Sequence, residues 1–222
     1  MINKEPEKIK TMFNKIAQNY DLLNNIISFF THYQVKKIAV KSLNIIPNSK
    51  VLDLCCGTGD LGKIAKKLTS SCEVTGVDFS KNMTNIAAKK NPNIQYLEQD
   101  ATNLNFENNS FDYILMGFGL RNIQNRKSAL KEVFRVLKKD GVFLHLDFGA
   151  KNFLNKIYDN IISVLTRIFF KNKESYLYLL KSKNEFPAPN ILAEEFKDIG
   201  FKVKTIKYCC FNLISFQICT KN

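Results

Sequence analysis

The chain has 222 residues, of which 45% are hydrophobic and 24% charged, and its formal net charge is +13 at pH 7. This length suits one domain with a sizeable core, and the apolar content excludes an intrinsically disordered chain. The charge invites a nucleic-acid interpretation, but residues 51–150 hold 13 cationic residues against 11 acidic ones. The cations comprise 29 Lys and 4 Arg, whereas base reading and bidentate phosphate binding favour Arg. The composition therefore argues against nucleic-acid binding.

The first 48 residues are predicted to form a helical lid. Within residues 5–45, apolar side chains such as Phe13 and Ile16 recur at helical spacing. The N-terminus begins MINKEPEKIK, which lacks the apolar core of a signal peptide. We therefore expect a cytoplasmic protein.

Residues 49–150 alternate between strand-like and helix-like segments and are predicted to bind a cofactor. The strand candidates are the apolar runs 50–56, 73–80, 93–101, 111–119 and 141–148. Apolar residues at helical spacing follow the first strand candidate, and they recur from Leu130 to Leu137. Ser80 is placed to cap the helix after the second strand candidate. Strands separated by helices imply right-handed crossovers and a parallel sheet. This region is predicted to be a doubly wound, Rossmann-like α/β unit.

Residues 151–222 are predicted to supply substrate-side helices and the last strands of the sheet. The segment 153–170 is apolar at helical spacing, yet Asp159 and Arg167 interrupt it. It is too polar to span a membrane, but association with a membrane surface stays open.

The end of the chain is predicted to be a helix near 190–199, ended by Gly200, and two strands, 201–208 and 211–220. The short link between these strands makes them antiparallel. With the five earlier strands they give a seven-stranded, mostly parallel sheet within a single domain, 1–222.

A glycine-rich turn follows the first strand and reads D-L-C-C-G-T-G from Asp53 to Gly59. Gly57 and Gly59 let the backbone bend sharply and approach a ligand closely. Asp78 ends the second strand, where a carboxylate accepts hydrogen bonds from ribose hydroxyls, and Asp100 ends the third, near the position of an adenine amino group.

Two cofactors fit this layout, and the acidic residues favour one of them. The pattern G-x-G-x-x-G is present through Gly62 and would suit NAD. Against NAD, Asp53 opens the turn and Asp60 follows it, and a pyrophosphate gains nothing from neighbouring carboxylates. S-adenosylmethionine carries a sulfonium and an amino group, which acidic neighbours suit. The turn is therefore typical of a class I methyltransferase.

The six cysteines are predicted to be reduced thiols. They lie at positions 55, 56, 72, 209, 210 and 219, and no pair has the two-residue spacing of a zinc knuckle or a redox dithiol. We predict no metal site.

Ordered motifs along nearly the whole chain resemble the C-methyltransferases of ubiquinone and menaquinone biosynthesis. The matching strings are YDLLN (20–24), VLDLCCGTGDL (51–61), GVDFSKNM (76–83), NNSFD (108–112), GFGLRN (117–122), RVLK (135–138) and LDFG (146–149), with Tyr176 and Phe186-Pro187 beyond them. The chain departs from the family pattern in having Val35 in place of Trp and Asp147 in place of Glu. Its tail, FNLISFQICTKN, also differs, so these departures bear on the choice of substrate.

The resemblance implies a polyprenylated quinol as substrate, with methylation of a ring carbon. It implies that Arg121 and Asn122, at the mouth of the fourth strand, together hold the ring oxygen as a phenolate, and that Tyr20 lines the ring site from the lid. Because the pKa of arginine exceeds about 12, we expect Arg121 to stabilise charge while water takes the proton. Cofactor contacts are implied for four further positions: Thr58, Ala101, Gly117 and, with its backbone, Gly57.

Three alternatives stay open at this point. The first is a class I methyltransferase acting on another small aromatic molecule. The second is a nucleic-acid methyltransferase, which would carry a different string where this chain has GFGLRN. The third is a binding protein without catalysis, which would have lost Arg121-Asn122 or Asp78.

The charge outside residues 51–150 suggests a docking role. Residues 1–50 hold 8 cations against 3 acids, and residues 151–222 hold 12 against 6. This Lys-rich excess suits peripheral contact with an anionic membrane surface, although compositional drift would also produce it. The sequence leaves the oligomeric state open, a homodimer included.

Overall fold

The computed structural model describes residues 4–149, 153–169 and 173–222, with the side chains of 154–156, 165–169 and 173–177 left undescribed. The expected environment of Tyr176 and of the second half of the 153–170 apolar stripe therefore lies outside the described residues. Among the described residues, no helix is both long and apolar enough to cross a membrane.

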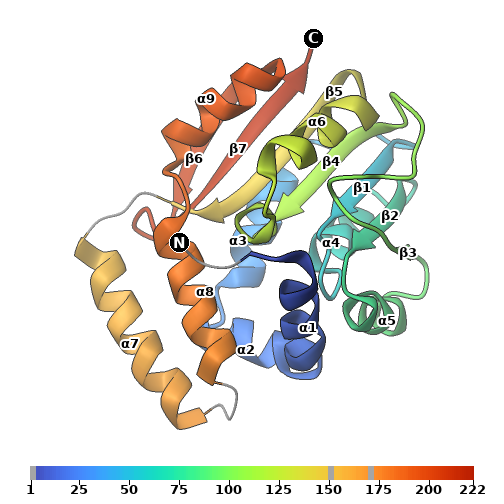
Figure 1. Ribbon diagram of the computed structural model, residues 1–222. Coiled ribbons are helices and arrows are strands. Elements are labelled where there is room, and N and C mark those ends of the chain that lie inside the picture. The colour runs from blue at the N-terminus through green and yellow to red at the C-terminus, as the bar shows by residue number, and fades with distance from the viewer. Residues whose placement is uncertain (1–3, 150–152, 170–172) are drawn as a thin grey trace.

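The fold is a seven-stranded sheet in the order β3-β2-β1-β4-β5-β7-β6 (Figure 1). Its strands are β1 (Lys50–Leu54), β2 (Glu73–Asp78), β3 (Gln95–Glu98), β4 (Phe111–Gly117), β5 (Leu137–Phe148), β6 (Phe201–Cys209) and β7 (Ile214–Lys221). Strands β1 to β5 pair in parallel, and β7 lies antiparallel between β5 and β6. The predicted mostly parallel sheet with an antiparallel C-terminal strand is confirmed.

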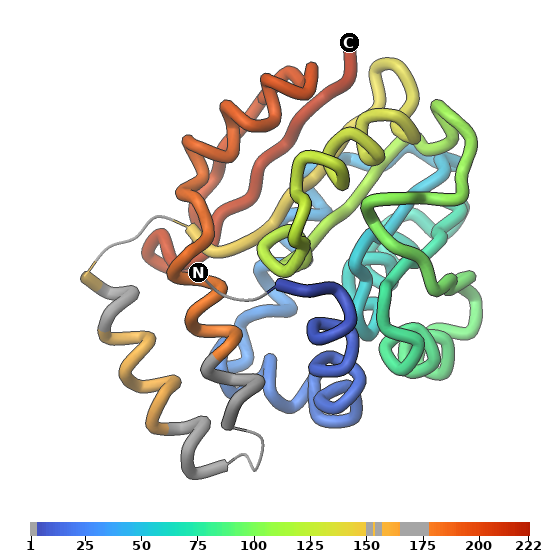
Figure 2. Tube along the Cα trace, in the orientation of Figure 1, coloured from blue at the N-terminus to red at the C-terminus, as the bar shows by residue number. Residues whose placement is uncertain are grey.

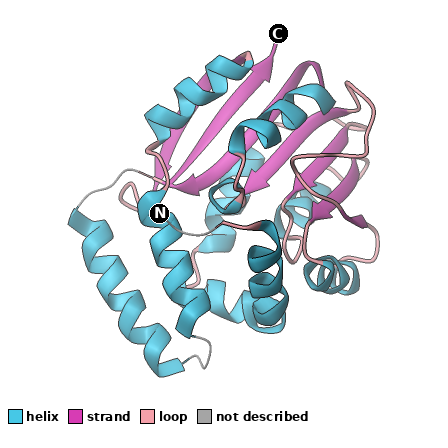
Figure 3. Cartoon of the chain, viewed as in Figure 1, coloured by secondary structure: helices cyan, strands magenta, loops and turns pink. Residues whose placement is uncertain are grey.

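Helices cover both faces of the sheet (Figure 3). One face packs on α6 (Arg126–Val136) and α9 (Pro189–Ile199), and the other packs on α3 (His32–Lys41) and α4 (Asp60–Leu68). Helix α5 (Lys81–Lys90) contacts β2 and β3. The sheet is therefore buried on both sides, as a parallel sheet requires.

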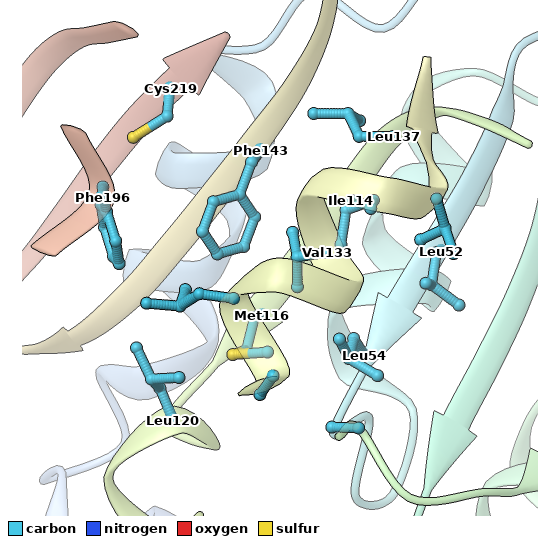
Figure 4. Packing of buried hydrophobic residues seen from close by; sticks show 14 of the residues in the cluster. Leu52, Leu54, Ile114, Met116, Leu120, Val133, Leu137, Phe143, Phe196 and Cys219 are labelled. Atoms are coloured by element: carbon cyan, nitrogen blue, oxygen red, sulfur yellow. The ribbon is translucent and has the colours of Figure 1, made fainter. Parts of the chain in front are cut away.

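The larger core lies between the sheet and helices α6 and α9 (Figure 4). Apolar side chains from alternate positions of the central strands, such as Ile114 and Phe143, meet Val133 of α6 and Phe196 of α9. All four are completely or almost completely buried. This packing fixes β4 and β5, whose carboxyl ends carry the predicted site.

Four further helices gather at the carboxyl edge of the parallel strands (Figures 1 and 2). They are α1 (Pro6–Ile16), α2 (Tyr20–Ile27), α7 (Phe153–Phe169) and α8 (Lys173–Glu185), with a short 3₁₀ turn at Ala17–Asn19 between the first two. Ile16 and Leu23 pack with Met83 of α5 in a small core of their own. The predicted helical character of residues 5–45 is confirmed.

Several element boundaries differ from the sequence prediction, and the start of β5 and the length of β3 differ most. Helix α6 ends at Val136, and Leu137, predicted as its last apolar position, instead begins β5. Leu137 is extended and pairs with Phe111 of β4, so strand pairing takes priority over helical periodicity there. The third strand is shorter than predicted because only Gln95–Glu98 pairs with β2.

Candidate active site

The glycine-rich turn follows β1 in a conformation that glycine makes accessible. Gly57 has φ +54° and Gly59 φ +85°, and Cys55, although not a glycine, has φ +56°. The backbone N–H of Gly57 donates to the Asp78 carboxylate at 2.8 Å, so the turn is anchored to the end of β2. The predicted turn geometry is present.

The two glycines differ in what surrounds them. A Cβ on Gly57 would lie 3.5 Å from the Tyr20 ring, an ordinary contact, whereas a Cβ on Gly59 would collide with the Tyr96 hydroxyl. Gly57 lines both cavities described below, and Gly59 is absent from the lining of each. Gly59 therefore shapes the turn and does not line the cavity in which the cofactor is predicted to bind.

Asp53 is a buried carboxylate with one oxygen in use. Its Oδ2 accepts the backbone N–H of Gly62 at 2.7 Å, and its buried Oδ1 has no hydrogen-bond partner among the described residues. Burial raises the pKa of Asp53 to about 7, although the hydrogen bond from the Gly62 N–H acts in the opposite direction and lowers this pKa. An ammonium group reaching Oδ1 would satisfy this oxygen, so the site fits the amino group of S-adenosylmethionine.

A first cavity of about 320 Å³ opens beside the ends of β1, β2 and β4. It brings together five of the residues predicted to bind the cofactor, namely Gly57, Asp78, Asp100, Ala101 and Gly117. Asp78 also accepts the backbone N–H of Ser80 at 2.9 Å, which fixes its orientation. Phe13 of α1 lines the same cavity, so the lid covers it.

A second cavity of about 310 Å³ lies on the other side of the glycine turn. Arg121 and Thr58 line it together with Tyr158 of α7, Phe148 at the end of β5 and His32 of α3. Elements from both ends of the chain thus close around the carboxyl edge of the sheet.

The two cavities share a wall. Its residues are Tyr20, Cys55, Gly57, Gly117 and Phe118. A Cβ on Gly117 would meet Leu61 at 2.8 Å, which explains why glycine stands at the end of β4. Burial raises the pKa of Tyr20, so its phenol stays protonated at neutral pH. A group bound in one cavity can thus reach a group bound in the other across Tyr20 and the glycines.

Arg121 lies in the second cavity as half of a buried ion pair. Its Nη1 donates to Asp147 at 2.9 Å and to the carbonyl of Phe118 at 2.8 Å, and its Nε has no partner among the described residues. The guanidinium carbon lies 5.6 Å from the Phe118 ring centre and 5.2 Å from that of Phe148. Two aromatic rings and a carboxylate therefore hold the arginine in place and leave its buried Nε donor unused.

Asn122 meets Arg121 at the Phe118 carbonyl but borders a different cavity. It lines the first cavity and not the second, and its Nδ2 donates to the Phe118 carbonyl at 3.1 Å. Consecutive residues of a 3₁₀ turn (Leu120–Asn122) thus line different cavities, and the expectation that both side chains hold the ring oxygen stays a prediction.

Polar contacts fasten the lid to the cofactor-binding residues. The Thr58 hydroxyl donates to Asp21 of α2 at 2.6 Å, and Lys90 of α5 donates to the other Asp21 oxygen, also at 2.6 Å. Ser80 donates to the side chain of Asn14 at 2.6 Å. Thr58, predicted to contact the cofactor, is thus engaged with the lid and faces the second cavity.

His32 is held as a neutral imidazole. Burial and the nearby Lys36 ammonium lower its pKa to about 4, although Asp60 raises it. Its Nε2 lies 2.9 Å from the Asn25 Oδ1, and its Nδ1 is 3.9 Å from Asp60, beyond hydrogen-bond length. Lys36, 2.8 Å from Asp60, satisfies that carboxylate instead.

Three contributors to the site escaped the sequence prediction, namely Asp21, Lys36 and Tyr158. Asp21 lies in the family-like string YDLLN (20–24), but the sequence alone does not show that it pairs with Thr58. Lys36 is a buried lysine on a helix with an apolar face, and a charged residue in such a position is itself a signal of a functional role. Tyr158 stands in a stripe read as apolar, yet its hydroxyl donates to the carbonyl of Ile27 at 2.8 Å.

Comparison with known proteins places the chain in a family. A family model for the ubiE/COQ5 methyltransferase family matches residues 1–221. The chain is 39% identical over 205 residues to the demethylmenaquinone methyltransferase of Staphylococcus epidermidis, covering 88% of this chain and 85% of the relative. It is 35% identical over 213 residues to the demethylmenaquinone methyltransferase of Listeria welshimeri, covering 90% of each. This chain belongs to the ubiE/COQ5 methyltransferase family.

Membership of the ubiE/COQ5 family confirms the predicted enzyme class and the predicted cofactor, S-adenosylmethionine. A SAM-dependent methyltransferase of Thermotoga maritima shares the fold, with a TM-score of 0.72 and 23% identity over 96% of this chain and all of that one (100%). That likeness concerns the fold alone. The dehydrogenase interpretation of the glycine pattern is excluded by the family.

Proposed function

We propose that this protein methylates a ring carbon of a polyprenylated quinol, with demethylmenaquinol as substrate and menaquinol as product. The observation that carries the proposal is the pair of cavities that meet at Tyr20 and Gly117, one lined by Asp78 and Asp100 and the other by Arg121. The family relatives named above support the choice of quinol. A precursor of ubiquinone is the second candidate substrate.

The first cavity is assigned to the cofactor. Asp78 would accept the ribose hydroxyls, and Asp100 and Ala101 would border the adenine. Asp53 lines the second cavity and not the first, and its unused oxygen would accept the amino group where the cofactor reaches the wall that the two cavities share. Gly57 and Gly117 of that wall would let the methyl donor lie against backbone. When bound, S-adenosylmethionine supplies an electrophilic methyl group.

The second cavity is assigned to the quinol ring. Loss of a hydroxyl proton makes the neighbouring ring carbon nucleophilic, and a fixed cation stabilises the resulting phenolate. Arg121 supplies that cation through its unused Nε, while Asp147 orients the guanidinium. The hydroxyl proton leaves to water, since an arginine side chain retains its own protons. Once the ring carbon has gained the methyl group, its hydrogen leaves as a proton, the ring becomes aromatic again, and the phenolate oxygen takes up a proton from water to give the methylated quinol.

Tyr20 is assigned to positioning of the ring. It lines both cavities, and Phe13 packs edge-on against it with ring centres 6.2 Å apart. Burial keeps its hydroxyl protonated, so it can donate a hydrogen bond without acting as a base. Asn122 is assigned to the cofactor side, where its cavity lies.

The experiment is methyl transfer from labelled S-adenosylmethionine to short-tailed demethylmenaquinol and, separately, to a ubiquinol precursor. We expect transfer to the first, and an Arg121→Lys variant should lose about 10²–10³ in kcat, because lysine cannot reproduce the planar fork. Arg126→Lys is the matched control, since Arg126 pairs with Glu195 away from both cavities that meet at Tyr20. Full activity of Arg121→Lys, or no transfer to either quinol, would contradict the proposal.

Because such a quinol dissolves in lipid, the proposed function includes peripheral contact of the protein with a membrane surface.

A further inference from the structure

We propose that the rim of the second cavity is a membrane-docking surface, through which a lipid-dissolved substrate enters from the bilayer. The rim consists of Phe29 and Phe30, between α2 and α3, and Phe211, between β6 and β7. It continues into the exposed face of α7. The inference rests on the proposed function for the identity of the substrate, whereas the surface itself is argued from exposure, backbone conformation and charge.

The three phenylalanines are unusually exposed for their size. Relative accessibilities are 56% for Phe29, 71% for Phe30 and 84% for Phe211. Leaving a phenyl ring in water is unfavourable in proportion to its exposed apolar surface. Their exposure at one opening of the protein indicates a surface that another apolar phase covers.

The backbone conformation at these residues is strained, which supports a functional placement. Phe29, Phe30 and Phe211 have φ values of +49°, +62° and +55°, a region that bulky residues rarely adopt. The turn before α3 is closed by hydrogen bonds from Phe29 N–H to the Ile26 carbonyl at 3.2 Å and from Phe30 N–H to the Asn25 carbonyl at 2.7 Å. Strain that the surrounding structure maintains is concentrated at functional sites.

The rim is continuous with the second cavity. Phe29 and Phe211 both line it, together with Leu213 and Ile214 at the start of β7. Arg121 lines the same cavity. An apolar path thus leads from the exposed rings to the buried guanidinium, as an aromatic head with a long apolar tail requires.

Helix α7 extends this surface. Its inward side places Ile162 in the interior and Tyr158 against α2, through the hydrogen bond to the Ile27 carbonyl. A neighbouring stripe of four exposed apolar side chains runs along the helix: Phe153, Ile157, Ile161 and Val164. A helix with one packed side and one exposed apolar side suits the boundary between headgroups and acyl chains.

The charge around the rim favours a lipid surface over an apolar protein partner. The rim is built from residues 1–50 and 151–222. The first segment has 8 cationic and 3 acidic residues, a net charge of +5, and the second has 12 and 6, a net charge of +6. Lys37 on α3, seven residues after Phe30, and Lys207 on β6, four residues before Phe211, are both exposed. Basic side chains beside apolar ones match anionic headgroups above acyl chains.

The test is co-sedimentation of the full chain with vesicles of phosphatidylcholine alone and of equal parts phosphatidylcholine and phosphatidylglycerol. We expect binding to the anionic vesicles, and Phe30→Ser and Phe211→Ser should each weaken it about tenfold. Ile46→Ser is the matched control: this isoleucine is 64% exposed but precedes β1, at the opposite edge of the sheet. Equal binding by Phe30→Ser and the wild type would overturn the docking surface.

Activity separates failure of this inference from failure of the proposed function. Phe30 lines neither cavity, so Phe30→Ser should methylate a short-tailed quinol in solution at the wild-type rate. It should lose activity on a long-tailed quinol embedded in vesicles. If wild type binds anionic vesicles but methylates no quinol, the function fails and the surface stands. If Phe30→Ser abolishes a concentration-dependent dimer in light scattering without altering vesicle binding, the rim is an interface between copies, and the inference is wrong.

Discussion

Asp53 and Arg121 are buried ionic side chains that line a cavity, and each has one polar atom without a partner. For Asp53 this atom is Oδ1, and for Arg121 it is Nε, in both cases among the described residues. Leaving such an atom unpaired costs about 1–3 kcal/mol or more for a charged group. Sites that bind a ligand retain this cost because the ligand satisfies the atom, so each residue marks where one ligand group must lie.

At this scale we predict a pH-dependent affinity for S-adenosylmethionine. The pKa of Asp53 is about 7, so its carboxylate fraction, and with it the affinity, should rise as pH increases through 7. Asp53→Asn should bind the cofactor about 10–100-fold more weakly, because a charged hydrogen bond is lost. Calorimetry between pH 6 and 8, roughly one unit to each side of this pKa, checks both effects.

Asp198→Asn is the control, because Asp198 is exposed on α9 and lies outside both cavities that meet at Tyr20. The stability of the cofactor-free protein should change oppositely with pH. The folded pKa of Asp53 lies above its ordinary value of 3.8, so the stability from this group is complete below that value and is lost as pH rises through about 7. An affinity that stays flat across this range would refute the assignment of Asp53.

At the scale of elements, polar contacts predominate in the attachment of the lid. Asp21, Asn14 and Lys10 on the first two helices bind Thr58, Ser80 and Glu98 at 2.6–2.7 Å. The apolar component is the small core around Ile16, Leu23 and Met83. Because only a small apolar core accompanies these contacts, we expect this element to open while the sheet remains folded.

We predict that Thr58→Val accelerates dissociation of S-adenosylmethionine about tenfold, since the loss of a hydrogen bond to a carboxylate weakens the closed lid. Stopped-flow displacement of the cofactor measures this rate. Thr58→Ser keeps the hydroxyl and should dissociate at the wild-type rate. If S-adenosylmethionine dissociates from the Thr58→Val variant as slowly as from the wild type, the Asp21 contact does not hold the lid closed.

At the scale of the whole molecule, the last strand joins the parts of the chain. Strand β7 is inserted between β5 and β6, and Lys221 at its end donates to the Phe134 and Leu137 carbonyls, both at 2.7 Å. The regions 1–48, 49–150 and 151–222 all reach the carboxyl edge of one sheet (Figure 1). We propose that they form one domain and not three.

This arrangement predicts a single cooperative unfolding transition. Urea unfolding should give the same midpoint by far-ultraviolet circular dichroism and by tyrosine fluorescence, since the protein has 8 Tyr and no Trp. Saturating S-adenosylmethionine should move both midpoints together. A chain ending before Ile214 should not fold, because β6 has no partner other than β7 in the described sheet. Two separate transitions would contradict a single domain.

The fold class and half of the site follow from local features of the sequence. Apolar runs separated by helical spacing predicted the parallel sheet, because periodicity reports which face of each segment is buried. The acidic residues at the ends of β1 and β2, with the glycines between them, predicted the cofactor edge. Such features are local, since carboxyl ends of parallel strands always meet at one edge.

The tertiary structure decided the rest, because those contacts join distant segments. Only folding brings Asp147 to Arg121, 26 residues earlier, and Thr58 to Asp21 of the lid. Pairing with β4 starts β5 at Leu137, against the helical spacing. Folding also places Asn122 and Arg121, which both donate to the Phe118 carbonyl, in the linings of different cavities. The sequence by itself determined which chemical groups line the edge of the sheet, and the three-dimensional packing determined which of them share a cavity.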